Sequence, residues 1–388
     1  MTGSIRRRGV VAAVVALCAG LVAFAPAAGA QAEDSRPTAA VSLGDSYISG
    51  EAGRWEGNSS RDSGDRRGTD RAAYRWGWFW RYDQARVYGD SASGCHRSDV
   101  AEINSAGLAV DAAINLACSG ADTADILRAA NGGTSHRGEP PQADQLAAVA
   151  AQYDVELIVL SIGGNDLGFA DIILDCVLDY TTSPSWLQNR CNPEQQANVD
   201  ARMAGAMAGL TTAIADIRAV MDEAGQPVGS YRFVVQSYPS PIPRGAEFRY
   251  RESGWSRTFT GGCPFWNADA DWANDSLVPQ IADNIAAVTA ATGVELLDLR
   301  DAFDGREVCS STTRQGPGPD AEWARYVSTG ILQGEVQESM HPNAIGQRAL
   351  GRCLALVAAA PVGDHACTNT PGAGPEAMVL SSVPVPTG

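Results

Sequence analysis

Five short apolar runs divide this chain, and they constrain its fold more than any other feature. Each run is β-branched or aliphatic and ends in Gly, Ser, Pro or Asp, as buried parallel strands do. Long helical patterns lie between the runs. Strands alternating with helices predict a doubly wound α/β fold, in which three layers enclose a central parallel sheet of about five strands. The predicted strands are Ala39 to Leu43, Ala112 to Leu116, Val155 to Ile162, Tyr231 to Gln236 and Val294 to Leu297.

Helical patterns fill the intervals between these runs. The strongest repeats apolar residues three or four positions apart from Val199 to Met221, and a second extends from Asp269 to Ala291. A last helix is expected to begin after Pro342, because proline suits the first turn of a helix, and to end near Val357.

A dense aromatic segment interrupts the alternation. Every second residue from Tyr74 to Tyr82 is aromatic, and these five side chains would share one face of an extended segment. They would form either a buried edge or hairpin face of the domain, or a wall that contacts a substrate. The polar, glycine-containing stretch before them, Gly57 to Arg71, predicts a surface loop.

The first residues predict a secretory signal peptide. Arg6, Arg7 and Arg8 precede an apolar run, and Ala28-Gly29-Ala30 supplies the small residues of a cleavage site. Residues 1–30 would therefore be removed near Ala30, and the mature protein would be secreted. No later segment is long and apolar enough to span a membrane, so stable membrane insertion is not expected.

The chain is acidic, with 45 Asp and Glu residues against 29 basic ones and a net charge of -16. Such a surface disfavours nucleic acid and anionic membranes as standing partners. Every basic residue is arginine. The absence of lysine excludes Schiff-base chemistry and a Ser-Lys catalytic pair.

Cysteine usage agrees with an exported protein. Of nine cysteines, Cys18 lies in the signal peptide, which leaves an even number for disulfide bonds. The sequence contains neither C-x-x-C nor H-E-x-x-H, so neither a metal site nor a cofactor is expected.

The first predicted strand runs directly into "SLGDSYISG", which places Ser46 where open α/β sheets bind their ligands. Taken alone, Ser46 is as well explained by a capping or turn serine. A second Gly-Asp-Ser sequence, at residues 89–91, has no convincing strand before it and is interpreted as a turn.

Three further segments have functional candidates at the ends of elements. "NLACSGADT" contains Gly120 after a strand, and "LSIGGNDLGF" contains Asn165 after two glycines. "ESMHPNAIGQ" contains His341, one of only four histidines in the chain. Read singly, each has an ordinary alternative, which is a turn glycine, a turn asparagine or a structural histidine.

Together, "GDSY", "ACSGA", "GGND" and "ESMHPNAIGQ", in this order, resemble the SGNH (GDSL) hydrolase superfamily. The resemblance is to its secreted actinobacterial esterase, lipase and phospholipase branch, and it runs from about Val41 to Gln347. It implies a flavodoxin-like α/β/α sandwich. Residues 31–367 would then form a single domain with surface insertions. Residues 368–388, rich in Pro, Gly and Ser, predict a disordered tail.

The resemblance also implies the site residues. Ser46 would be the nucleophile and His341 its general base, while the Ser46 and Gly120 N–H groups and the Asn165 amide would form an oxyanion hole. The family usually has aspartate three residues before the histidine, where this chain has Glu338. Either its carboxylate or a backbone carbonyl of Glu338 or Ser339 would orient His341.

The disulfide pairing follows from the resemblance for three bonds, and the fourth pair consists of the two cysteines left over. The expected bonds are Cys95–Cys118, Cys176–Cys191, Cys263–Cys309 and Cys353–Cys367.

The expected function is hydrolysis of acyl esters by a secreted monomeric serine esterase whose partner is a small-molecule or lipid ester. Lipase or phospholipase A or B activity and acyl transfer are the alternatives within the enzyme class. A carbohydrate- or surface-binding module with an inactive site is the alternative outside it, suggested by the aromatic segment.

Overall fold

The computed structural model describes residues 36–58, 69–89, 94–328 and 334–383. The predicted signal peptide, most of the predicted loop before the aromatic segment, and Asp90 and Ser91 of the second Gly-Asp-Ser sequence lie outside these residues. In the part of the chain that is described, no helix has the length and apolar character to cross a membrane.

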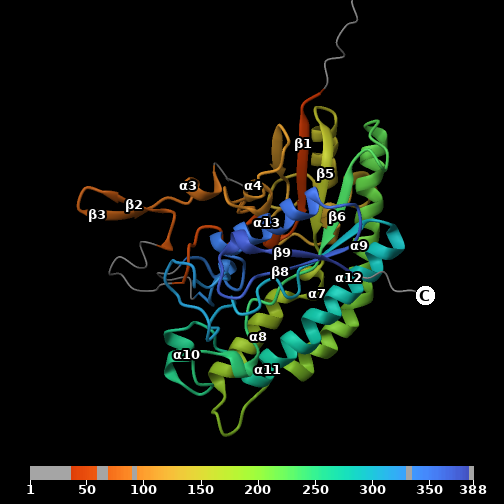
Figure 1. The fold of residues 1–388 in the computed structure, drawn as a ribbon. Helices are drawn as coiled ribbons and strands as arrows, with labels where there is room; N and C mark the ends of the chain where they lie inside the picture. Colours follow the sequence, from red (N-terminus) through yellow and green to blue (C-terminus); the bar gives the residue numbers. More distant parts are fainter. Residues whose placement is uncertain (1–35, 59–68, 90–93, 329–333, 384–388) are drawn as a thin grey trace, which may run out of the picture. The chain divides into compact units, whose positions relative to one another are not determined.

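A seven-stranded sheet forms the centre of the described domain (Figure 1). Its order is β4-β1-β5-β6-β7-β8-β9, and every neighbouring pair is parallel except β8 and β9. The first five strands have the flavodoxin-like order, which confirms the predicted fold class. The strands are β1 Thr38–Gly44, β4 Ala112–Asn115, β5 Asp154–Ser161, β6 Arg232–Gln236, β7 Glu295–Asp298, β8 His365–Thr368 and β9 Val379–Ser382.

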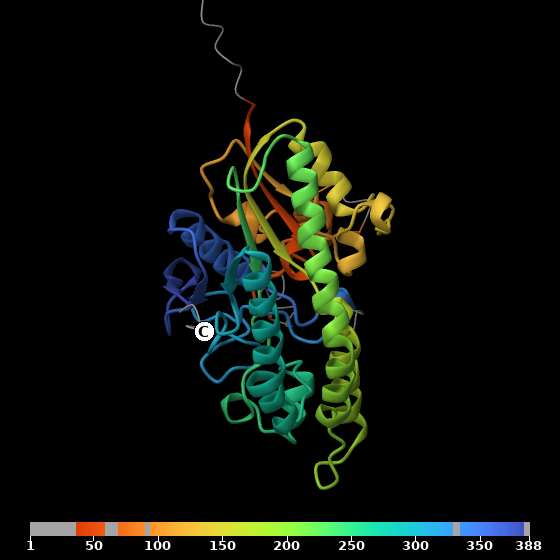
Figure 2. The same cartoon turned by 90° about the vertical axis from the view of Figure 1, so that its right-hand side faces the viewer.

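Helices cover both faces of this sheet. The long helix α9 (Asn192–Glu223) packs against α6 (Gln142–Ala150) and α12 (Val278–Thr292), and Figure 2 shows α9 and α12 side by side. On the other face, α13 (Ala344–Ala359) packs against α4 (Glu102–Ser105). Strands covered on both sides must be apolar throughout, which is why they appear in the sequence as continuous apolar runs.

The predicted helix from Asp269 to Ala291 is divided into three parts. Helix α11 (Asn267–Trp272) leads into a π-helical turn, Ala273–Leu277, and α12 follows. Pro279 lies in the first turn of α12. Because proline has no N–H, the regular helical hydrogen bond cannot form there, and the wider turn accommodates the break.

The prediction of one shared aromatic face is wrong. Strands β2 (Ala73–Trp76) and β3 (Phe79–Tyr82) form a separate antiparallel hairpin, in which Tyr74 pairs with Arg81 and Trp76 with Phe79. Directly paired residues share a face, so Trp80 and Tyr82 lie on the opposite face from Tyr74 and Trp76. Of the two alternatives for this segment, a buried face does not hold at the tip of the hairpin, which is exposed.

The tail is ordered over most of its length, contrary to what its composition predicts. The antiparallel strand β9 pairs with β8, and Val383 donates a backbone hydrogen bond to Asp364. Strands β8 and β9 extend one edge of the central sheet, so the sheet has more strands than the five predicted. Residues 384–388 lie outside the described part of the chain.

All four predicted disulfide bonds are present: Cys95–Cys118, Cys176–Cys191, Cys263–Cys309 and Cys353–Cys367. The first ties the segment before α4 to the loop after β4, and the last ties α13 to β8. Each bond therefore joins elements that the chain brings together from different layers or loops.

We predict that stability losses follow the length of chain each disulfide closes. Replacing Cys353 and Cys367 with alanine, which opens a separation of 14 residues, should cost about 3 kcal/mol of unfolding free energy. The same change at Cys263 and Cys309, separated by 46 residues, should cost about 4 kcal/mol. Urea unfolding measures both. A free thiol titrated in the denatured mature protein would contradict the pairing.

Candidate active site

Ser46 begins the one-turn helix α1 (Ser46–Ser49) at the carboxyl end of β1. Only glycine fits at position 44, because its φ is 138° and a Cβ there would lie 1.9 Å from the Ser161 carbonyl oxygen. Asp45 then caps α1 by accepting a 3.0 Å hydrogen bond from the Tyr47 N–H. The sharp turn and the cap together fix Ser46 at the edge of the sheet.

His341 meets Ser46 across 295 residues of sequence. Its Nε2 lies 2.7 Å from Ser46 Oγ, and its Nδ1 lies 2.9 Å from the carbonyl oxygen of Ser339. A carbonyl only accepts hydrogen bonds, so Nδ1 carries the proton and Nε2 is free to accept from the serine hydroxyl. This tautomer is the one in which histidine can act as a base toward serine.

The carboxylate of Glu338 does not orient His341, so the assignment of Glu338 to the catalytic set is wrong in its geometry. Its oxygens accept hydrogen bonds from Trp55 Nε1 at 2.8 Å, from Tyr88 OH at 3.1 Å and from a backbone N–H of its own turn. The side chain is 1% exposed. The backbone alternative is the one found, with Ser339 rather than Glu338 supplying the carbonyl.

The environment of His341 favours its neutral form. Burial lowers the pKa of His341 below its ordinary value of 6.5, although the charge of Glu51 opposes this. The ring lies 5.0 Å from that of Tyr47, whose hydroxyl donates a 2.8 Å hydrogen bond to the Met340 carbonyl. Met340 has a φ of 62°, a strained value for this residue type, and it is held there by the surrounding contacts.

A second histidine, His96, lies next to the loop that carries His341, within 3.5 Å of Gln337 Nε2. His96 Nδ1 is 2.6 Å from an oxygen of Glu51, and the His96 ring stacks on Tyr88. Burial alone would lower the pKa of His96, but the hydrogen bond and charge of Glu51, with more distant carboxylates, raise it. The two buried histidines therefore have pKa values shifted in opposite directions.

The expected oxyanion donors lie on loops that are fastened to one another. Asn165, in α7 (Gly164–Leu167), donates a 2.7 Å hydrogen bond from Nδ2 to the Ala121 carbonyl. Asp166 accepts from the N–H and hydroxyl of Thr123 at 3.1 and 2.6 Å. Among the described residues, the N–H groups of Ser46 and Gly120 have no hydrogen-bond acceptor, so both are available to a ligand.

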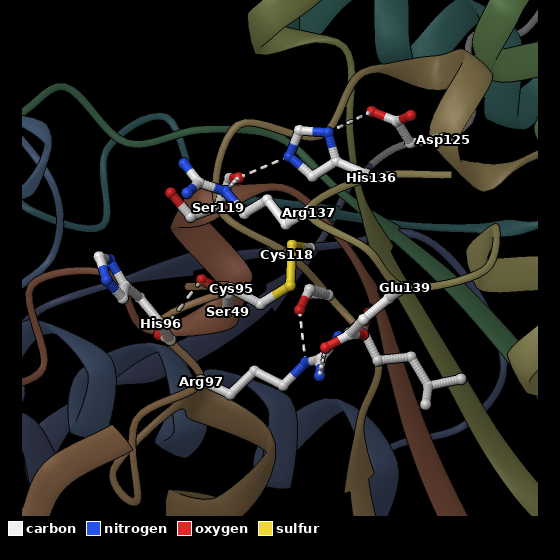
Figure 3. Close-up of a disulfide and its surroundings, with 12 residues drawn as sticks. Ser49, Cys95, His96, Arg97, Cys118, Ser119, Asp125, His136, Arg137 and Glu139 are labelled. Atoms are coloured by element: carbon white, nitrogen blue, oxygen red, sulfur yellow. Dashed lines mark hydrogen bonds and ion pairs between the residues drawn. A yellow bond between two sulfur atoms is a disulfide. The ribbon is translucent and has the colours of Figure 1, made fainter. Parts of the chain in front are cut away.

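Figure 3 shows how the loop that contains Cys118 and Ser119, just before Gly120 in the sequence, is held. The Cys95–Cys118 disulfide anchors it, and the Ser119 carbonyl accepts hydrogen bonds from His136 Nε2 at 2.9 Å and Arg137 Nε at 2.8 Å. These contacts leave little freedom to the backbone N–H that follows Ser119.

Asp45 has a structural role, as its place in the turn suggests. Its second oxygen accepts a 2.6 Å hydrogen bond from Tyr238 OH. Burial raises the pKa of Asp45 to about 7, which this hydrogen bond and the one from Tyr47 partly offset. Both oxygens of the Asp45 carboxyl group are thus engaged in hydrogen bonds within the protein.

A cleft contains the pair. Ser46, Asn165 and His341 line it together with apolar side chains that include Leu174 and Val336. A more apolar cavity adjoins it, and the two share Tyr47, Phe169 and Ile173 as a common wall. The second cavity continues between α8 (Phe169–Thr182) and the start of α12. No cluster of three or more His, Cys, Asp or Glu residues suited to a metal ion occurs within the described ranges.

Several supporting residues have no signal in the sequence. Tyr238 lies 193 residues from the aspartate it contacts, and Glu51 lies 45 residues from His96. Nothing in the spacing of one sequence connects such pairs, because only the folded chain brings them together.

The chain is similar to proteins of known family. The profile of the GDSL-like Lipase/Acylhydrolase family matches residues 42–349. Lipase 1 of Streptomyces coelicolor is 28% identical over 82% of this chain and 87% of its own length. A lipase of Streptomyces rimosus is 29% identical over 60% of this chain and 64% of its own.

Two solved structures are also similar. An extracellular lipase of Streptomyces rimosus aligns with 83% of this chain and all of its own, at a TM-score of 0.44 and 23% identity. Phospholipase A1 of Streptomyces albidoflavus NA297 aligns with 83% of this chain and 98% of its own, at a TM-score of 0.44 and 26% identity. Because the family profile matches most of the length of this chain, the chain belongs to the GDSL-like lipase/acylhydrolase family and is an ester hydrolase.

Proposed function

We propose that this enzyme cleaves acyl esters of lipids through an acyl-enzyme, with Ser46 as nucleophile and His341 as general base. The observation that carries the proposal is the 2.7 Å contact between His341 Nε2 and Ser46 Oγ. A serine hydroxyl is a poor nucleophile until a neighbouring base accepts its proton, and His341 has the tautomer that does so.

The reaction follows from these positions. Ser46 Oγ attacks the ester carbonyl while its proton passes to His341 Nε2, and the Ser339 carbonyl holds the Nδ1 proton of the imidazolium. The tetrahedral oxyanion accepts from the N–H groups of Ser46 and Gly120 and from the amide of Asn165, each worth about 2.7–4 kcal/mol in comparable enzymes. His341 then protonates the leaving alcohol, and water attacks the acyl-enzyme by the same route.

The proposed lipid substrate rests on the apolar cavity and on the relatives. The cavity wall of Tyr47, Phe169 and Ile173 begins beside Ser46, where the acyl chain of a bound ester would leave the carbonyl. Both curated relatives are named lipases. We further propose that the enzyme is secreted, which the signal-like residues 1–30 and the four disulfides support.

Replacing Ser46 with alanine tests the nucleophile. We expect kcat/KM for p-nitrophenyl esters to fall by at least about 10³-fold, with unchanged folding by circular dichroism, and labelling by a fluorophosphonate probe to disappear. Ser91→Ala, in the second Gly-Asp-Ser sequence, is the matched control and should retain both activity and labelling. Labelling that persists in Ser46→Ala would contradict the assignment.

The carboxylate of Glu338 should matter less than the aspartate of a standard triad. Glu338→Gln removes the charge but leaves the Ser339 carbonyl on Nδ1, so the productive tautomer remains. We expect kcat/KM to fall by less than about 100-fold, against about 10⁴-fold when an orienting aspartate becomes its amide. His341→Ala measures the full loss, and equal losses in the two variants would show that the carboxylate does the orienting.

The acid limb of the pH profile should report His341. Only neutral His341 can accept the serine proton, and its pKa is lowered by burial, so kcat/KM should persist down to a midpoint below pH 6.5. His96, whose pKa is raised, would instead give a midpoint above 6.5. If the midpoint lay above pH 6.5 and the acid limb disappeared in His96→Asn, the limb would report His96, and the assignment of His341 as the base would be contradicted.

A further inference from the structure

The β2–β3 hairpin carries an exposed group of large aromatic side chains. Its sequence, "AYRWGWFWRY", contains six aromatic residues in Ala73–Tyr82, whereas aromatic residues make up 7% of the chain. Trp78 at the turn is 95% exposed, Phe79 66% and Trp76 63%. Clustered apolar side chains of this size on a surface mark a place of contact with another body.

The same hairpin is locally basic on an acidic protein. Arg75 lies over the ring of Trp80, Arg81 over that of Trp76, and Arg86 of α3 (Ala85–Tyr88) over that of Tyr74. None of these arginines forms an ion pair with a carboxylate in the described part of the chain, and Ala73–Tyr88 contains a single acidic residue, Asp83, against the three arginines. Charges beyond about 8 Å are screened at physiological salt, so a ligand at the tip meets this positive charge first.

The hairpin is connected to the mouth of the active-site cleft. In Figure 1 it projects away from the central sheet. Just after β3, Gln84 Nε2 donates a 2.6 Å hydrogen bond to Glu335, which directly precedes the cleft-lining residues Val336 and Gln337. Val336 is itself exposed. A surface held by the hairpin would therefore lie beside the opening to Ser46.

We propose that the β2–β3 hairpin docks the enzyme on an anionic phospholipid surface. Trp78 would enter the headgroup region, where its amphipathic ring is stable, and Phe79 would bury its apolar ring beside it, while Arg75 and Arg81 contact lipid phosphates. The proposal rests on the lipid-ester function above. The attraction to anionic lipid would come from the hairpin alone, because the overall negative charge of the chain repels such a surface.

The two other occupants fit the charges less well. A second copy of this chain would bring an identical positive hairpin, so that like charges would face each other across a symmetric contact. A neutral polysaccharide would stack on the aromatic rings but would leave the arginine charges without a partner. A phospholipid surface satisfies both, because its interface with the acyl chains takes up the rings and its phosphates pair with the arginines.

Vesicle flotation with the full chain tests the proposal. Ser46→Ala supplies an inert background, so that the lipid is not consumed, and the vesicles contain phosphatidylcholine with or without phosphatidylglycerol. Combined Trp76→Ser, Trp78→Ser and Phe79→Ser should weaken binding to the mixed vesicles at least about tenfold. Arg75→Gln with Arg81→Gln should weaken it about fivefold for each arginine, and only when phosphatidylglycerol is present.

The matched control is a second exposed aromatic pair. Trp255 and Phe259 on α10 (Trp255–Phe259) are 74% and 62% exposed and stack on each other, without the arginines of the hairpin. Changing both to serine should leave vesicle binding unchanged. The proposal would be overturned if the two sets of substitutions weakened vesicle binding equally. It would also be overturned if the protein bound insoluble polysaccharide instead of vesicles, or if it formed a dimer that the hairpin substitutions dissociate.

Hydrolysis by the chain with Ser46 intact separates this inference from the proposed function. The hairpin variants should retain wild-type rates on soluble p-nitrophenyl acetate but lose fatty-acid release from mixed vesicles. If fatty acid is released as fast without the hairpin aromatics, the docking proposal fails and the lipase function stands. If the hairpin binds vesicles but no fatty acid is released, the lipid-ester function fails and the docking stands.

Discussion

The contact between His341 and Ser46 is the constraint on which the rest of the site depends, because its two residues come from opposite ends of the domain. It requires the loop before α13 to return to the carboxyl end of β1. Gln347 in α13 secures this return by donating to the Tyr47 carbonyl at 2.7 Å, while the Tyr47 hydroxyl donates to the Met340 carbonyl. Two hydrogen bonds of opposite direction thus hold α1 against the histidine loop.

Buried charged side chains pack against the loop that carries His341. Glu338 is enclosed by donors, with Trp55 on one oxygen and Tyr88 on the other, and burial raises its pKa although Arg54 opposes this. Arg54 is itself paired with Asp70 at 2.7 Å, away from solvent. A buried ion pair contributes little net stability, but breaking one is costly, so this network specifies one conformation of the loop. The same loop places the Ser339 carbonyl 2.9 Å from His341 Nδ1.

The same buried residues also connect the candidate active site to the β2–β3 hairpin. Arg54 lies over the ring of Tyr82, the last residue of the hairpin, 5.8 Å from its centroid. From there, contacts through Trp55 reach Glu338, next to the carbonyl that holds His341. The proposed lipid-docking element and the proposed general base are thus built on the same buried support, which fixes the position of the cleft mouth relative to the hairpin.

The sequence by itself determined the layers, because strands buried on both faces must be apolar along their length, and the ends of parallel strands share one edge. The candidate site residues came from its resemblance to the SGNH hydrolases. The rule for buried parallel strands located β1 and β5, and it placed Ser46 and Asn165 at the same edge. It could not choose between the Glu338 carboxylate and the Ser339 carbonyl, because the choice depends on donors from Trp55 and Tyr88, about 250 residues or more away. Nor could alternation reveal that the chain reverses at Gly77 and divides the aromatic residues between two faces. Local pattern fixes which residues an element buries, whereas only the tertiary structure decides which distant partner satisfies each buried polar group.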